Sequence, residues 1–154
     1  MRKGNLAAVF GCLLLLTACG GGKQEHYIGR QVGLDLPRAQ ETESLDSHGG
    51  FHGDGLRLDK LVFSSADGRE IEEQIQGRGD LWNSGPFDDY LGGILYGGGP
   101  AAEGEWPRAP EEAYCFFEDR HEGKGALGER GAWNYTAALY DADTDTLYYL
   151  EFDT

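Results

Sequence analysis

Residues 132–152, AWNYTAALYDADTDTLYYLEF, form the stretch that decides the fold. Two runs of aromatic and apolar residues, 132–140 and 146–152, flank Asp-Ala-Asp-Thr-Asp at 141–145. Aromatic residues favour strands, whereas clustered aspartates favour turns. The pattern therefore predicts a β-hairpin. Because successive side chains of a strand point to opposite faces, at most one of Tyr148 and Tyr149 is expected in a core.

The aspartates of the hairpin have a second interpretation, as calcium ligands. Asp141, Asp143 and Asp145 match the first three ligand positions of an EF-hand loop. The match ends there, because Thr146 stands where that loop requires glycine and Phe152 where it requires a bidentate glutamate. The sequence thus favours a turn over a calcium site.

Working outward from the hairpin, further elements follow from hydrophobic spacing. Strands are expected at 114–118, at 56–64 with a bulge near 59–60, and at 32–36, where apolar and other residues alternate. A short helix is expected from Asp67 to Gly77, residues 82–95 have roughly helical spacing, and the polar stretch 38–48 is expected to be a loop. The fold class is α+β: about five mainly antiparallel strands with one or two short helices, in a single domain over residues 27–154.

The N-terminus has the features of a targeting segment. Arg2 and Lys3 precede an apolar stretch at 6–16, which is too short to span a bilayer. Leu16-Thr17-Ala18-Cys19 resembles the lipobox of bacterial lipoproteins. That resemblance implies a signal peptide at 1–18, a lipid on Cys19, and a place on the extracytoplasmic face of the cell membrane. Residues 19–26 are then the lipidated cysteine and a flexible, glycine-rich tether.

Charge and cysteine content limit the kinds of partner and of site chemistry that the protein can have. Loss of residues 1–18 removes two basic residues and no acidic ones, so the formal net charge changes from −14 to −16. Such a surface repels nucleic acid, which is therefore excluded as a partner. Of the three cysteines, Cys12 leaves with the signal and Cys19 carries lipid, so Cys115 is alone. Its apolar neighbours predict a buried side chain.

A glycine-rich loop carries the residues that are best suited to a metal. His48, His52 and Asp54 lie within HGGFHGDG, residues 48–55, and His121 is the fourth candidate ligand. Imidazole and carboxylate groups bind zinc and similar divalent ions, the one cofactor that this pattern suggests. The alternative is a tight turn whose polar side chains bond the backbone. Asp119-Arg120-His121 likewise suits either acid–base chemistry or an ion pair with a solvated histidine.

Three stretches together resemble a group of short lipoproteins of Gram-positive, anaerobic-type bacteria. They are HGGFHGDG at 48–55, FEDRH at 117–121, and the segment from Trp133 through YDADTDTLYY at 140–149 to Thr154. No activity is known for that group. The resemblance implies a lipoprotein in a single-membrane cell and assigns no functional residue.

The sequence thus predicts a membrane-anchored extracytoplasmic lipoprotein that acts as a binding or envelope-associated module for a protein or glycan partner. An exposed aromatic face on the hairpin would fit this role. The alternative is a metal-dependent hydrolase that uses His48, His52, Asp54 and His121, which requires these side chains to converge in a pocket. No catalytic residue is assigned.

Overall fold

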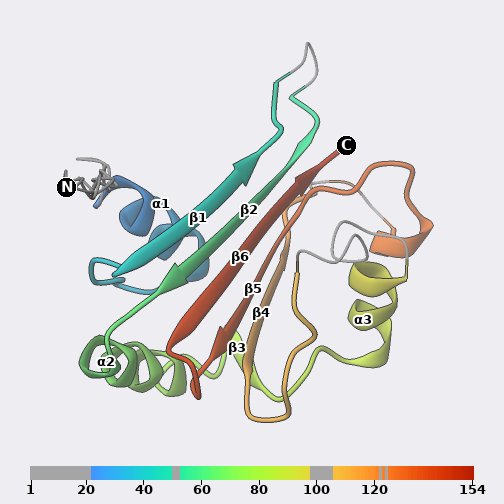
Figure 1. Cartoon of the computed structure of the whole chain (residues 1–154). Coiled ribbons are helices and arrows are strands. Elements are labelled where there is room, and N and C mark those ends of the chain that lie inside the picture. Colours follow the sequence, from blue (N-terminus) through green and yellow to red (C-terminus); the bar gives the residue numbers. More distant parts are fainter. Residues whose placement is uncertain (1–21, 50–52, 98–105, 122, 124) are drawn as a thin grey trace, which may run out of the picture.

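A computed structural model describes residues 22–49, 53–97, 106–121, 123 and 125–154. Within them, one six-stranded antiparallel sheet has the strand order β1-β2-β6-β5-β4-β3 and is accompanied by three α-helices. Figure 1 shows α1 and α2 near the β1–β2 side of the sheet and α3 near β3 and β4. The α+β, antiparallel prediction is confirmed. None of the helices in the described part of the chain has the length and apolar character needed to cross a membrane.

The bounds of the elements are as follows. The helices are α1 (Lys23–Val32), α2 (Ser65–Gln76) and α3 (Asp89–Tyr96), with a turn of 3-10 helix at Leu127–Glu129. The strands are β1 (Glu41–Asp46), β2 (Gly55–Val62), β3 (Trp82–Ser84), β4 (Tyr114–Asp119), β5 (Tyr135–Asp141) and β6 (Thr146–Asp153).

The C-terminal hairpin lies in the middle of the sheet. β6 pairs with β5 on one side and with β2 on the other. In the turn, the Asp141 carboxylate accepts hydrogen bonds from the Asp143 N–H at 3.0 Å and the Thr144 hydroxyl at 2.9 Å. Asp145 adopts a left-handed conformation (φ 50°), which aspartate tolerates better than most residues. The predicted hairpin and its turn are confirmed.

The sheet has a hydrophobic core on each face. The first, the α1/α2 layer, includes Ile28 and Val32 of α1 with Ile71 and Ile75 of α2. The second, the α3 layer, includes Ile94 and Leu95 of α3 and lies on the other face. Strand β6 contributes to both, since Tyr149 belongs to the α1/α2 layer and its neighbour Leu150 to the α3 layer. Burial of apolar side chains on both faces stabilises this arrangement.

Two apolar faces also explain why the hydrophobic residues of β2 change from one side of the strand to the other. Its register with β6 is continuous from Gly55 opposite Asp153 to Val62 opposite Thr146, so the predicted bulge near 59–60 is wrong. Leu61 is buried in the α1/α2 layer, whereas Leu56 and Leu58 pack against the α3 layer. The change of parity reflects two hydrophobic faces rather than an inserted residue.

The N-terminal third differs most from expectation. The predicted strand at 32–36 is wrong: helix α1 runs to Val32 and ends at Gly33, whose φ of 72° is the left-handed conformation that glycine adopts easily. Residues 23–26 form the first turn of this helix, so the tether interpretation is wrong for them. The expected loop at 38–48 contains strand β1.

Two other helical predictions need adjustment. Helix α2 begins at Ser65, two residues before Asp67: Ser64 is the N-cap, and its hydroxyl accepts from the Asp67 N–H at 3.2 Å. Ile71 and Ile75 lie on its buried side, as their spacing predicts. The segment 82–95 divides into β3 and α3, because Asp88 caps a new helix by accepting from the Leu91 N–H at 2.8 Å.

A polar cluster fixes α1 to the sheet. Asp59, which is buried, accepts from Arg57 Nε at 2.6 Å and from Gln24 of α1 at 2.6 Å. The Tyr27 hydroxyl donates to the Glu151 carboxylate at 2.8 Å, and the Arg57 guanidinium lies 4.6 Å from the centre of the Tyr27 ring. A buried charge is tolerated when it is paired in this way. These contacts hold α1 over one face of β2 and β6.

Candidate binding surface

In the described part of the chain, the opposite face of β1, β2 and β6 carries no helix, and it is partly open around Leu45, Leu58 and Tyr148. In Figure 1 these three strands cross the view with no helix in front of them. An open groove of about 370 Å³ runs along this face. We call it the sheet groove; it is lined by Glu43, Ser44, Leu45, Leu58, Asp59, Lys60, Trp106 and Tyr148.

Apolar side chains form much of the sheet groove. Leu45 is 47% exposed, and it is the one apolar residue of β1. Opposite it, Leu58 of β2 is half-buried, and so is Tyr148 of β6. Leucine and tyrosine side chains that remain partly exposed in one concave place are typical of a contact surface.

Trp106 holds the aromatic part of the sheet groove in place. This tryptophan is 4% exposed, and its ring packs edge-on against Tyr148 with the ring centres 6.4 Å apart. Edge-to-face aromatic pairs prefer such geometry. Trp106 therefore helps to hold Tyr148 in position, and Tyr148 stays half-buried. Tyr149, the next residue, is fully buried on the other face, as the alternation in the sequence predicts.

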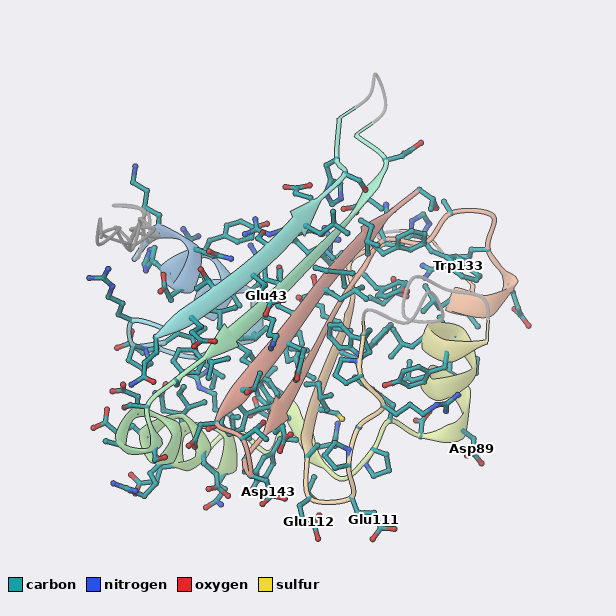
Figure 2. All side chains as sticks on the ribbon, viewed as in Figure 1. Glu43, Asp89, Glu111, Glu112, Trp133 and Asp143 are labelled. Carbon is teal, nitrogen blue, oxygen red and sulfur yellow. The ribbon has the colours of Figure 1, made fainter. Side chains whose placement is uncertain are left out.

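Charged groups lie along the β1 side of the sheet groove. Lys60 of β2 donates to the Glu43 carboxylate at 2.9 Å, and this hydrogen bond raises the pKa of Lys60. Figure 2 shows Glu43 beside β1 and β2. Glu41, two residues earlier, has the same parity and is exposed. The groove therefore combines an apolar floor with an acidic border.

His48, one of the predicted metal ligands, lies beyond the end of β1. Its Nδ1 is 2.8 Å from a carboxylate oxygen of Asp46, and its Nε2 is 3.1 Å from one of Asp153. The His48 ring thus lies between two carboxylates and links the end of β1 to the end of β6. The His48 backbone N–H also bonds Asp46, and these contacts lower the pKa of the Asp46 carboxyl.

Asp153 links His48 to the second predicted region. Its carboxylate accepts from Arg120 at 3.0 Å, and Arg120 also donates to the Tyr135 carbonyl at 3.1 Å. Asp119 pairs with Arg130 at 2.6 Å. The Asp119-Arg120-His121 triplet thus contains two ion-paired residues, and the contacts of Arg120 link the end of β4 to β5 and β6.

Of the other predicted metal ligands, the structure describes Asp54 and His121, and neither completes a three-ligand cluster with His48. Asp54 is exposed, and His121 is placed by its backbone N–H, which donates to Asp119 at 3.1 Å. His52 lies outside the described residues, as does Cys19, the predicted lipidation site. Among the residues that the structure describes, no three His, Cys, Asp or Glu side chains are arranged to hold a metal ion. A metal site that includes His52 stays a prediction.

Comparison with known proteins adds no relative. A scan against protein-family models found no match, and searches of curated proteins and of solved structures found none either. The sheet groove was not singled out from the sequence. Two features of the sequence are consistent with it. In residues 56–63 the apolar side chains change from one face of the strand to the other, which marks a strand with two apolar faces. Tyr148 and Tyr149 are adjacent in one strand and must therefore lie on opposite faces of the sheet.

Proposed function

We propose that this protein is a lipid-anchored, extracytoplasmic binding module whose ligand lies in the sheet groove. The observation that carries the proposal is the uncovered face of β1, β2 and β6, where Leu45, Leu58 and Tyr148 remain accessible in one concave surface. Behind this surface, β2 and β6 are covered by α1 and α2. Burial of the exposed apolar area by a ligand would be favourable.

The expected lipid would hold this module close to the membrane. Helix α1 begins at Lys23, four residues after Cys19. Four residues span at most roughly 14 Å even when fully extended. A module tethered in this way meets partners at the cell envelope rather than far from it. The net charge of −16 after processing favours cationic or neutral ligands over nucleic acid.

The anchor is tested by substitution of the two N-terminal cysteines. Cys19→Ala should move the protein from the detergent phase to the aqueous phase after detergent phase separation, because lipid can no longer be attached. Cys12→Ala, which alters the signal segment alone, should leave the protein in the detergent phase. Retention of the Cys19→Ala protein in the detergent phase would contradict lipidation at this cysteine.

The binding surface is tested by site-specific photocrosslinking in intact cells. A photoreactive amino acid at position 45 should give discrete adducts, since Leu45 borders the sheet groove. The same amino acid at position 143 serves as the control, because Asp143 is exposed at the distant hairpin turn (Figure 2). Equal adducts at both positions, or none at position 45, would count against the groove as the ligand site.

A further inference from the structure

Strand β1 has an unpaired edge. It lies at one end of the strand order and pairs with β2, and within the described residues no strand pairs with its other side. All six of its residues are exposed. Natural sheets usually shorten, cover or charge such an edge, because its free N–H and C=O groups can pair with another chain.

The register shows which backbone groups are free. The Ser47 N–H donates to the Leu56 carbonyl at 2.9 Å, and these two residues continue the register of β1 with β2. In an antiparallel pair, alternate residues bond the same neighbour. The N–H and C=O groups of Thr42, Ser44 and Asp46 therefore point away from β2, toward the unpaired edge.

The side chains of β1 indicate what could lie along this edge. Glu41, Glu43 and Leu45 share the parity of the sheet groove, and Asp46 adds a third carboxylate. β1 contains no lysine or arginine. A second copy of β1 would bring like charges together across the new pair, which is unfavourable. A strand with basic side chains complements the same edge.

We propose that an extended peptide segment rich in lysine or arginine binds along β1 as a seventh strand of the sheet. Its backbone pairs with Thr42, Ser44 and Asp46, and alternate side chains lie beside the sheet groove. This inference rests on the proposed function of that groove and names the class of ligand. Cross-strand neighbours lie about 5 Å apart, so basic residues meet Glu41 and Glu43 while an apolar residue meets Leu45.

A synthetic peptide can test the pairing directly. The dye-labelled peptide KTKTVTKTK places valine opposite Leu45 and lysines opposite Glu43 and Glu41 in either strand direction, because its sequence is palindromic. Binding to the full-length lipoprotein in detergent micelles is followed by fluorescence anisotropy. The expected result is saturable binding that is lost when glutamate replaces every lysine, or when alternate peptide amides are N-methylated.

Ser44 provides a matched pair of variants. Ser44→Pro removes an N–H that points to the free edge and leaves the hydrogen bonds to β2 in place, since proline is tolerated on an edge strand in this orientation. Ser44→Ala keeps the N–H. We expect the peptide affinity of Ser44→Pro to be at least tenfold lower than that of Ser44→Ala, which is the reference for loss of the hydroxyl alone. Unchanged circular dichroism of both variants shows that the fold is retained.

The outcomes separate this inference from the proposed function. Equal affinity of Ser44→Pro and Ser44→Ala would overturn strand addition, and so would equal binding of the acidic peptide. Absence of peptide binding by the wild-type protein would overturn the peptide as the ligand class. In each of these cases, adducts at position 45 in cells would still support the groove as a binding site, whereas loss of those adducts would remove the proposed function itself.

Discussion

Gly68 lies in the first turns of α2, where the helix approaches the turn of the C-terminal hairpin. A Cβ atom at this position would overlap the Asp145 side chain. The Gly68 carbonyl also accepts a hydrogen bond from the buried Tyr140 hydroxyl at 3.0 Å. The absence of a side chain at Gly68 therefore allows the helix and the hairpin to meet.

Gly68→Ala should destabilise the protein by about 1–3 kcal/mol, because a new methyl group is forced into a packed contact. Asp145→Gly removes the opposing side chain and suits the φ of 50°. In that background Gly68→Ala should be neutral or stabilising by up to about 1 kcal/mol, since alanine favours helices over glycine. Urea unfolding of the four proteins measures this coupling.

Gly77→Ala is the matched control for this cycle. Its φ of −74° is ordinary, and an added Cβ would make normal contacts at 3.5 Å. We expect no loss of stability there. Strictly additive effects of Gly68→Ala and Asp145→Gly would show that the two residues do not interact.

Cys115 is a second residue whose environment sets its chemistry. It is 3% exposed and is a free cysteine in the described part of the chain. Burial raises its pKa to about 12 from the ordinary 9.0. Roughly a thousandfold less thiolate is then present at neutral pH than for an ordinary cysteine, and the thiolate is the reactive form.

Iodoacetamide should therefore label native Cys115 at least about 100-fold more slowly than the urea-unfolded protein. An Asp143→Cys variant supplies an exposed thiol for comparison in the same chain, and mass spectrometry after timed labelling measures both rates. Rapid native labelling of Cys115 would contradict its burial and indicate a reactive thiol.

At the scale of elements, the sequence was informative where side-chain pattern and environment agree. The hairpin, β4 and the buried face of α2 were predicted because their apolar residues recur at strand or helix spacing. β1 was missed because Glu41–Asp46 is exposed on both faces and so has no apolar alternation. Its strand conformation depends on pairing with β2, which lies nine or more residues away in sequence.

α1 was missed for a different reason. Val32, Leu34 and Leu36 alternate like a strand, yet they are buried through a helix end and an extended segment. Ile28 and Val32 have helical spacing, and Gly33 is a typical helix C-terminal signal. The two patterns overlap, and the contact of α1 with β2 and β6 decides between them. The sheet groove likewise depends on which face the helices leave uncovered.

The central strands β5 and β6 predict a specific response to alkaline pH. Burial raises the pKa of Tyr135, Tyr140 and Tyr149 above the ordinary value of 10.0. The folded state thus favours the neutral phenol. Its contribution to stability is complete below about pH 10 and is lost as pH rises through the higher folded-state pKa values.

Above about pH 10, the free energy of unfolding should fall by up to roughly 1.4 kcal/mol per pH unit for each of these tyrosines. Their tyrosinate absorbance at 295 nm should appear together with the loss of circular dichroism. Tyr135→Phe removes one of the three groups and should make the decline shallower. Gradual ionisation of all eight tyrosines while the fold persists would contradict their burial.

At the scale of the whole molecule, one sheet separates two cores that share the same strands. In β5, Ala138 and Tyr140 belong to the α1/α2 layer, whereas Ala137 and Leu139 belong to the α3 layer. Loss of one layer would therefore expose apolar residues of strands that the other layer needs. Coupling of this kind favours a single cooperative unfolding transition.

A tryptophan in each layer makes this cooperativity measurable. Trp82 lies in the α1/α2 layer and Trp106 in the α3 layer, so variants that retain one of them and carry phenylalanine at the other two tryptophan positions report on one layer each. Ile75→Val and Ile94→Val remove the same methyl group from opposite layers, at an expected cost of about 0.5–1.5 kcal/mol each. Because both layers depend on β5 and β6, each substitution should lower the urea midpoint reported by Trp82 and by Trp106 equally. If Ile75→Val shifts the Trp82 transition and leaves that of Trp106 in place, the layers unfold independently, and the sheet groove could then open or close without loss of the α1/α2 core.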